Sequence, residues 1–191
     1  MDLLNEIRFF QNTGFFPCDA MNEAAMWMEA MDESSDGEVS PERDEILRRI
    51  EADDFVVDDY DAFVNNLRQS KRSSFLTQYT PDDFKNNGVK TFQVRDYPIG
   101  YALKKDADGV DIISVHNNSG VGGIGDALIQ SAVKHGGTKL DHFHGYLSDF
   151  YARNGFEEYD RYKWDDQYAP KDWDYDKYGR PDVIFRRLKN R

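Results

Sequence analysis

The sequence predicts a mixed α/β (α+β) protein in which a mostly antiparallel sheet is flanked by helices and preceded by an acidic helical region. Three observations support this prediction. Apolar residues recur at helical spacing through the first seventy residues, strand-like runs begin after about residue 72, and strands alternate with helical stripes in the last third. The 191 residues suffice for one core of ordinary size, which excludes two large domains. We therefore expect a helical region over 1–71 and a sheet domain over 72–191.

The first seventy residues contain four apolar stripes at the spacing of amphipathic helices. The third stripe follows Ser40 and Pro41, residue types that are favoured at an N-cap and at the first helical position. The second stripe is rich in methionine, which suits an adaptable surface for a protein partner, although methionine at this spacing more often belongs to an ordinary core. Residues 32–40 are polar and are expected to form a loop. The stripes are Leu3, Leu4, Ile7 and Phe10; Ala24, Ala25, Met28 and Met31; Ile46, Leu47 and Ile50; and Tyr60, Phe63, Val64 and Leu67.

Short apolar runs separated by turn residues predict the sheet. After an apolar stretch at 75–79, Thr80 and Pro81 open a short helix that ends before Gly88. The next three runs are separated by two turn segments, so we expect them to form an antiparallel meander. The later runs alternate with two helical stripes, which are expected to be crossover helices. The expected strands are 91–94, 99–104, 110–115, 139–143, 156–162 and 183–188, and the expected helices are 126–135 and 146–154.

Charge and cysteine content exclude several classes of function. The chain has 36 acidic and 24 basic side chains, so its net charge is −12 and most of its surface repels phosphate backbones and anionic lipids. Cys18 is the single cysteine, which excludes an intramolecular disulfide and a cysteine-based metal cluster. No apolar run approaches the roughly 18 residues of a membrane span, and an acid follows Met1 where a secretory signal would carry base. We expect a cytoplasmic protein without nucleic-acid or membrane partners.

A glycine-rich loop is the most informative segment of the sequence. Four glycines occur in six residues, at 120, 122, 123 and 125, between the strand that ends near Val115 and the next helix. Such a loop leaves the first-turn amides of the helix open and lets an anion approach the backbone. It lacks the Gly-Lys-Ser/Thr ending of a nucleotide-triphosphate loop and the acidic residue of a dinucleotide fold. The alternative is a turn that serves only to reverse the chain.

Counted from Val115, this loop resembles the coenzyme A loop of the GCN5-related N-acetyltransferase (GNAT) superfamily. The family pattern is Arg/Gln-x-x-Gly-x-Gly/Ala, followed by a helix with Leu three residues later, and residues 123–125 and Leu128 match it. Residues 150–156, Phe-Tyr-Ala-Arg-Asn-Gly-Phe, resemble the second motif of the family, in which a helical tyrosine stands four residues before a Gly-Phe pair. The resemblance covers residues 72–191. It extends more weakly to acetyltransferase-like proteins encoded by bacteriophages.

The resemblance implies a direct acetyl transfer from acetyl-CoA, as cosubstrate, to a primary amine. In that reaction a main-chain amide near Val115 polarises the carbonyl oxygen, and Tyr151 occupies the position of the general acid. His116 and His144 are candidates for the base because their side chains titrate near neutral pH. The residues expected to bind the coenzyme are Val115, Gly120, Val121, Gly122, Gly123, Ile124, Gly125 and Asp126.

Three positions depart from the family pattern. Asn117 stands at the proline position, and Gly120 stands at the Arg/Gln position, so no side chain of the loop contributes a positive charge. Asp126 places a negative charge where a pyrophosphate would dock, although an acid there stabilises the helix by about 0.3–1 kcal/mol. These departures leave open a different class of function, a catalytically silent binding or virion-associated structural module of the same fold.

A metal site is the weaker alternative for the histidines. Asp141, His142 and His144 lie close together, and strand alternation places the two histidines on one face. No further ligand occurs at a recognisable spacing, so we expect no metal.

The connection over 164–182 interleaves carboxylates with five aromatic residues. This composition suits a cationic acceptor, either a small amine or a basic peptide or protein. A long connection in a compact domain is usually functional or disordered, and the aromatic residues argue against disorder. The alternative is that the segment only packs across the edge of the sheet.

Overall fold

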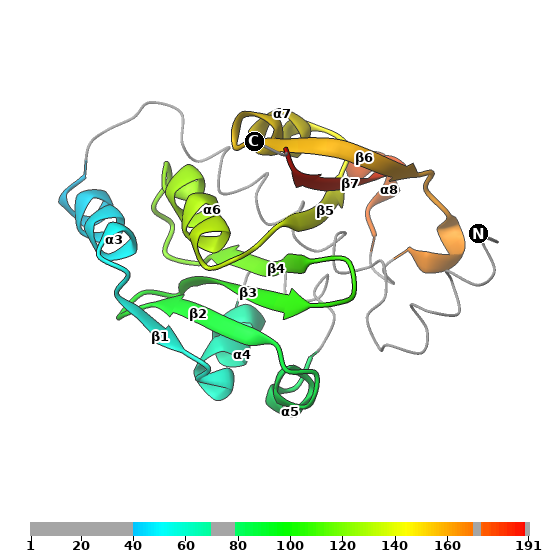
Figure 1. The fold of residues 1–191 in the computed structure, drawn as a ribbon. Helices are drawn as coiled ribbons and strands as arrows, with labels where there is room; N and C mark the ends of the chain where they lie inside the picture. Colours follow the sequence, from blue (N-terminus) through cyan, green and yellow to red (C-terminus); the bar gives the residue numbers. More distant parts are fainter. Residues whose placement is uncertain (1–39, 70–78, 170–172, 190–191) are drawn as a thin grey trace.

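The computed structural model describes residues 40–69, 79–169 and 173–189. These residues form a seven-stranded mixed sheet with the order β1-β2-β3-β4-β5-β7-β6, flanked by helices (Figure 1). Every pair of neighbouring strands is antiparallel except β4 and β5. The predicted fold class is therefore confirmed. The strands are β1 (Phe55–Val57), β2 (Lys90–Val94), β3 (Ile99–Lys105), β4 (Val110–Asn117), β5 (Lys139–Phe143), β6 (Phe156–Tyr162) and β7 (Val183–Leu188).

Helices cover both faces of the sheet. Side chains of α3 (Pro41–Glu51), α6 (Gly125–Lys134) and α7 (Tyr146–Arg153) belong to the main hydrophobic core. Those of α4 (Tyr60–Arg68) and α5 (Pro81–Asn86) form a second cluster on the other face. Figure 1 shows α6 in front of β3 and β4 and α4 behind them. The short helices η2 (Asp166–Tyr168) and α8 (Tyr175–Tyr178) lie in the connection between β6 and β7.

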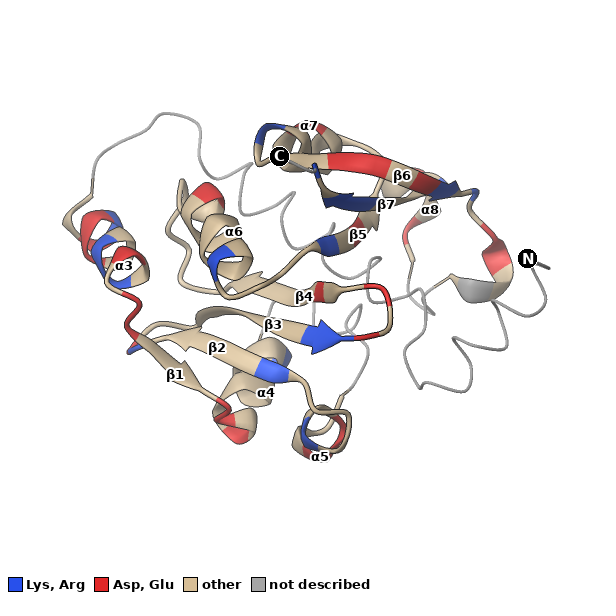
Figure 2. Cartoon of the chain, in the orientation of Figure 1, with Lys and Arg blue, Asp and Glu red and all other residues tan. Residues whose placement is uncertain are grey.

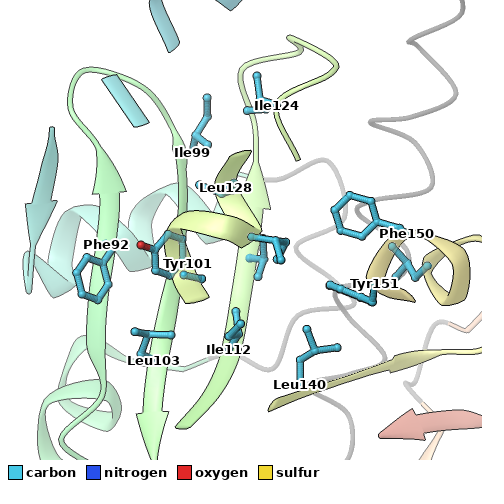
Figure 3. Close-up of a cluster of buried hydrophobic side chains, with 14 of the residues drawn as sticks. Phe92, Ile99, Tyr101, Leu103, Ile112, Ile124, Leu128, Leu140, Phe150 and Tyr151 are labelled. Carbon is cyan, nitrogen blue, oxygen red and sulfur yellow. The ribbon is translucent and has the colours of Figure 1, made fainter. Parts of the chain in front are cut away.

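The main core joins the two halves of the sheet. Figure 3 shows Tyr101 and Ile112, from β3 and β4, beneath Leu128 of α6, with Leu140 and Tyr151 of the other half beside them. All five side chains are at most 2% exposed. Because strand side chains alternate between faces, the neighbouring Ala102 and Ile113 point to the second cluster instead. Both faces of the central strands are therefore buried.

The parallel contact between β4 and β5 is limited to one residue pair, Asp111 with Lys139. Lys139 Nζ lies 2.6 Å from a carboxylate oxygen of Asp106 and 3.6 Å from one of Asp111. Beyond this pair the two strands diverge toward their carboxyl ends (Figure 1). The loop that follows β4 and the residues that follow β5 consequently lie at the open end of the diverging pair.

Most of the predicted elements are present. Ser40 caps α3, since its Oγ accepts a hydrogen bond from Arg43 N, and Thr80 and Asp83 form a reciprocal capping box at α5. The antiparallel meander, the two later helices and the last strands lie at their expected places within one or two residues. The stripes at 3–10 and 24–31, the loop over 32–39 and the apolar stretch at 75–78 lie outside the described residues.

The prediction of a wholly helical region over 1–71 is wrong at one element. Residues 55–57 form β1, which pairs with β2 at the edge of the sheet. The strand is three residues long and is bounded by Asp53 and Asp58, whose φ angles of 61° and 58° turn the chain sharply on either side. A run this short carries no measurable period, so the pattern of apolar residues could not indicate a strand.

The described part of the helical region packs into the same core as the sheet. Ile46 of α3 is fully buried in the main cluster, and the Phe55 ring of β1 meets the Tyr101 ring edge-on with centroids 5.8 Å apart. The expected boundary at residue 72 falls within 70–78, outside the described residues. Residues 41–57 therefore share the main core with the sheet, and α4 shares the second cluster with it.

Removing a buried side chain of α3 should destabilise the whole described fold. We expect Ile46→Ala to lower the free energy of unfolding by about 2–5 kcal/mol, the usual cost of such a cavity. Urea unfolding followed by near-ultraviolet and far-ultraviolet circular dichroism should give one coincident transition. The control is Glu51→Ala, exposed on the same helix, with a change within about 0.5 kcal/mol. Two separate transitions, with only the first altered by Ile46→Ala, would contradict the shared core.

Candidate functional site

A bulge in β4 precedes the glycine loop. Gly100 of β3 pairs with His116, and Ala102 pairs with Ile113, so β4 has one residue more than β3 in this interval. Ser114 lies in this bulge, and its φ is 53°. A bulge redirects the side chains that follow it. As a result Val115 faces the main core, whereas the His116 ring packs edge-on against Phe63 of the second cluster, with centroids 5.0 Å apart.

Hydrogen bonds within the glycine loop fix its first half. Asn117 Nδ2 donates to the carbonyl oxygen of Val121 (2.7 Å), and Asn117 Oδ1 accepts from Ser119 Oγ (2.7 Å). Ser119 Oγ accepts in turn from the Val121 amide (3.1 Å). Asn118 Nδ2 donates to the carbonyl oxygen of Asn66 (2.6 Å), which ties the loop to α4. Asn117, the departure at the proline position, therefore holds the loop in shape through its side chain.

The second half of the loop and the start of α6 present unsatisfied donors. The N-cap of α6 is Ile124, whose buried side chain cannot accept a hydrogen bond, and the helix has no side-chain cap. The first main-chain bond of the helix runs from Leu128 N to Ile124 O. Within the part of the chain that the structure describes, no acceptor takes a hydrogen bond from the amides of residues 122–127. Consecutive amides at a helix N-terminus are suited to an anion.

The carboxylate of Asp126 is neutralised by the end of α7. Its two oxygens accept from Arg153 Nε and Nη2 (3.1 and 3.2 Å), and Oδ1 also accepts from Asn154 Nδ2 (2.6 Å). Partial burial alone would raise the pKa of Asp126, but the hydrogen bonds from Arg153 and Asn154 bring the pKa below its usual value. The negative charge at the start of α6 is thus paired with a guanidinium.

Arg43 of α3 is a residue of this site that the sequence analysis missed. Its guanidinium lies against Gly123, and its Nε is buried without a hydrogen-bond partner among the described residues. Arg43 and Gly123 are 80 positions apart in the sequence, and no motif connects them. Only the folded structure therefore shows that Arg43 belongs to this site.

Tyr151 is fully buried between α7 and the sheet. Its ring lies 5.1 Å from the His142 ring and 6.1 Å from the Phe156 ring. His142 Nε2 accepts from Arg186 Nε at 2.8 Å, and its Nδ1 bonds the carbonyl oxygen of Phe143 at 2.6 Å. Because Nε2 accepts, the proton of the neutral ring is on Nδ1. Burial, followed by the charge of Arg186, lowers the pKa of His142 to about 4.

The two histidines predicted as bases occupy different environments. His116 is 1% exposed, and burial lowers its pKa to about 4, so the ring is neutral at pH 7 but has almost no contact with solvent. His144 is exposed at the carboxyl end of β5, where its amide donates to the carbonyl oxygen of Asp182. His144 and the glycine loop lie at the same end of the diverging strands, whereas the His116 side chain faces the second cluster.

The connection between β6 and β7 is built around a buried indole. Trp173 is 6% exposed, its Nε1 donates to the carbonyl oxygen of Gly179, and its ring lies 5.1 Å from Phe143 at the end of β5. Trp164 packs on Trp173 with ring centroids 4.8 Å apart. Asp166 is paired with Arg180 at 2.8 Å. The segment therefore packs on the sheet and also brings carboxylates to the carboxyl end of β5 (Figure 2).

The described ranges hold neither a metal-ligand cluster nor a membrane-spanning helix. There, no group of three or more histidine, cysteine, aspartate or glutamate side chains is arranged to hold a metal ion. No helix in those same ranges is long and apolar enough to cross a membrane.

Comparison with known proteins gives matches among solved structures. N-acetylglutamate synthase from Neisseria gonorrhoeae complexed with coenzyme A and N-acetyl-glutamate has 19% identity and a TM-score of 0.38, and the match covers 69% of this chain and 32% of that one. The same synthase complexed with coenzyme A and L-arginine has 16% identity and a TM-score of 0.41, over 66% of this chain and 31% of that one. A GNAT family acetyltransferase from Elizabethkingia anophelis with acetyl-CoA bound has 18% identity and a TM-score of 0.39, over 72% of this chain and 99% of that one.

The chain spans about a third of the length of the synthase chains that it matches. No protein-family model and no curated protein sequence matches it. The arrangement of its own sheet is nevertheless GNAT-like. An antiparallel meander leads into β4, the parallel pair β4 and β5 diverges, and the glycine loop connects β4 to α6. The chain therefore has the fold that the resemblance of residues 72–191 implied.

Burial of His142 should make the fold sensitive to acid. The ordinary pKa of 6.5 lies above the folded value of about 4, so the unfolded chain binds a proton between these pH values that the folded chain does not. Stability is therefore present above pH 6.5 and falls as the pH drops toward 4. One proton contributes about 1.4 kcal/mol per pH unit, which gives a loss of roughly 3 kcal/mol over this range.

His142→Gln should remove the contribution of His142 to this dependence, because glutamine can form both hydrogen bonds but does not titrate. The contribution of His116, whose pKa burial also lowers to about 4, should remain. The measurement is urea unfolding at several pH values from 4.5 to 7. His144→Gln is the control, since His144 is exposed, and it should leave the slope unchanged. Equal slopes for His142→Gln and the parent protein would show that His142 is protonated in the folded state.

Proposed function

We propose that this protein transfers the acetyl group of acetyl-CoA to the amine of a cationic acceptor. One observation carries the proposal: the open amides of residues 122–127 at an uncapped helix N-terminus, beside the diverging ends of β4 and β5. A coenzyme with a pyrophosphate and an extended amide-containing arm requires an anion site next to two strands that diverge. This chain offers both at the same end of its sheet.

The electrostatics of the loop support an anionic ligand. Glycines at 120 and 123 have φ angles of 77° and 75°, which a side chain rarely adopts, so they shape the curve of the loop. Arg153 pairs with Asp126, so the acid at the start of α6 does not present an uncompensated charge to a phosphate. The departure at Asp126 is thereby compatible with a bound pyrophosphate.

The transfer requires a bond from the amine nitrogen to the acetyl carbon and the loss of the bond from that carbon to sulfur. We assign the main-chain amide near Val115 to polarise the carbonyl oxygen of the thioester. We assign Tyr151 to donate its phenolic proton to the departing thiolate, a role that requires the phenol, buried in this structure, to become accessible when the coenzyme binds. His144 accepts the proton that the amine loses, since its side chain is exposed at the carboxyl end of β5. His116 remains the second candidate for this role.

The acceptor site is assigned to the connection between β6 and β7. Its carboxylates at Asp165, Asp174 and Asp176 are exposed, and the buried Trp173 anchors the segment to the end of β5. Negative charge beside aromatic rings favours a cation. A small amine or a basic peptide therefore fits this surface better than an anionic acceptor.

A catalytically silent binding module is the second candidate function. The full burial of Tyr151 favours it, because a packed phenol has no direct access to a leaving group in this conformation. The two functions share the fold and differ in turnover.

Calorimetry with acetyl-CoA and an assay for released thiol separate the two functions. The enzyme should bind acetyl-CoA and release thiol faster with a cationic amine such as spermidine than with glutamate. Binding without thiol release for any amine would favour the silent module. Absence of heat at millimolar acetyl-CoA would contradict acetyl transfer and leave the silent module.

Tyr151→Phe tests the general acid. The ring packing is kept and the proton donor is removed, so we expect turnover to fall about 10²- to 10⁴-fold while the affinity for acetyl-CoA stays within about twofold. The control is Tyr159→Phe, which changes an exposed tyrosine of β6 and should leave turnover unaltered. Unchanged turnover in Tyr151→Phe would show that Tyr151 only packs the core.

A further inference from the structure

Arg43 is exceptional among the arginines of the described residues. It is the single one whose guanidinium has neither a hydrogen-bond acceptor nor an ion-pair partner there. In a chain with a net charge of −12, carboxylate partners are abundant. On the same helix, Arg48 and Arg49 both bind Glu45. The isolation of Arg43 therefore needs a reason.

The guanidinium of Arg43 lies over the glycine loop. A Cβ atom placed on Gly123 would stand 2.8 Å from Arg43 Nε and 3.3 Å from both Cζ and Nη2. The glycine at position 123 therefore has two roles. It permits the φ of 75°, and its lack of a side chain lets the guanidinium of Arg43 contact the backbone. The close approach places a positive charge beside the backbone of Gly123, within the segment of open amides.

The hydrogen-bond donors of Arg43 lie beside the glycine loop, where they can bind a ligand. Nε is buried and has no partner among the described residues, whereas the side chain as a whole is only partly buried. A buried donor without an acceptor lowers stability unless something binds it. The position is held firmly, because Ser40 caps α3 and Ile46 and Ile50 anchor it in the core. The fold thus holds this guanidinium beside the loop without satisfying it.

We propose that Arg43 is a phosphate-binding residue, and that its guanidinium and the amides of residues 122–127 together hold the pyrophosphate of coenzyme A. The inference rests on the proposed function and names a residue for it. Arg43 supplies from α3 the positive charge that the loop lacks at Gly120. Guanidinium groups match phosphate oxygens with two parallel hydrogen bonds, which a lysine cannot do.

Calorimetry with three probes tests the assignment: coenzyme A, inorganic pyrophosphate, and pantetheine, which carries no phosphate. Arg43→Met should weaken coenzyme A and pyrophosphate about 10- to 100-fold, the usual effect of a hydrogen bond to a charged group. Pantetheine should bind both proteins equally. Arg43→Lys keeps the charge and should fall between the two. Arg48→Met is the matched control, an exposed arginine of the same helix, and should change no affinity more than about twofold.

Thermal unfolding without ligand separates phosphate binding from a structural role. Arg43→Met keeps the aliphatic stem and removes the unsatisfied donor, so its melting temperature should equal or exceed that of the parent protein. A clear fall would assign Arg43 to packing and overturn the proposal.

The outcomes distinguish this proposal from the proposed function. If the parent protein binds coenzyme A and Arg43→Met binds it equally, the role of Arg43 is refuted and acetyl transfer stands. If the parent binds pyrophosphate through Arg43 but does not bind coenzyme A, the function is refuted and the phosphate site stands. If it binds neither, both fail.

Discussion

The single parallel contact between β4 and β5 is the constraint on which the rest of the structure depends. Asp111 and Lys139 form its only residue pair among the described residues, and Lys139 Nζ bridges carboxylates of Asp106 and Asp111. Because pairing stops there, the strands diverge and their carboxyl ends separate. The main core, with Ile112 on one side and Leu140 on the other, holds the two halves of the sheet together behind the divergence.

Residues far apart in the sequence meet at the open end of this pair. The bulge at Ser114 leads β4 into the glycine loop, the end of α7 reaches back to Asp126, and α3 brings Arg43 to Gly123. The contact from α7 offsets the charge of Asp126, and the contact from α3 brings a positive charge to the loop. The site is therefore a product of three helices and a loop, and it cannot be attributed to the loop motif alone.

The sequence predicted the elements whose signals are local. The N-cap of α3, the capping box of α5 and the alternation of strands and helices after residue 90 depend on neighbours in the chain, and the structure confirms them. The strand β1 was missed because three residues have no period. The glycine loop was found from its spacing, and the structure adds why Asn117 can stand at the proline position.

The charges around the loop could not be predicted. Asp126 was expected to oppose a pyrophosphate, but its partner Arg153 is 27 residues away and meets it only because α6 and α7 pack together. Arg43 was missed for the same reason. Long-range pairing of this kind leaves no periodic or spaced pattern in a single sequence, whereas a cap or a turn does.

The most direct test is a titration of the ¹⁵N-labelled protein with coenzyme A, followed by the amide resonances of residues 122–127. An anion bound at the start of α6 accepts hydrogen bonds from these amides, so their proton signals should move downfield together and saturate with one affinity. Amides at the start of α5, such as Asp82, should not follow the same course. Saturable shifts confined to other segments, with residues 122–127 unchanged, would contradict the coenzyme site.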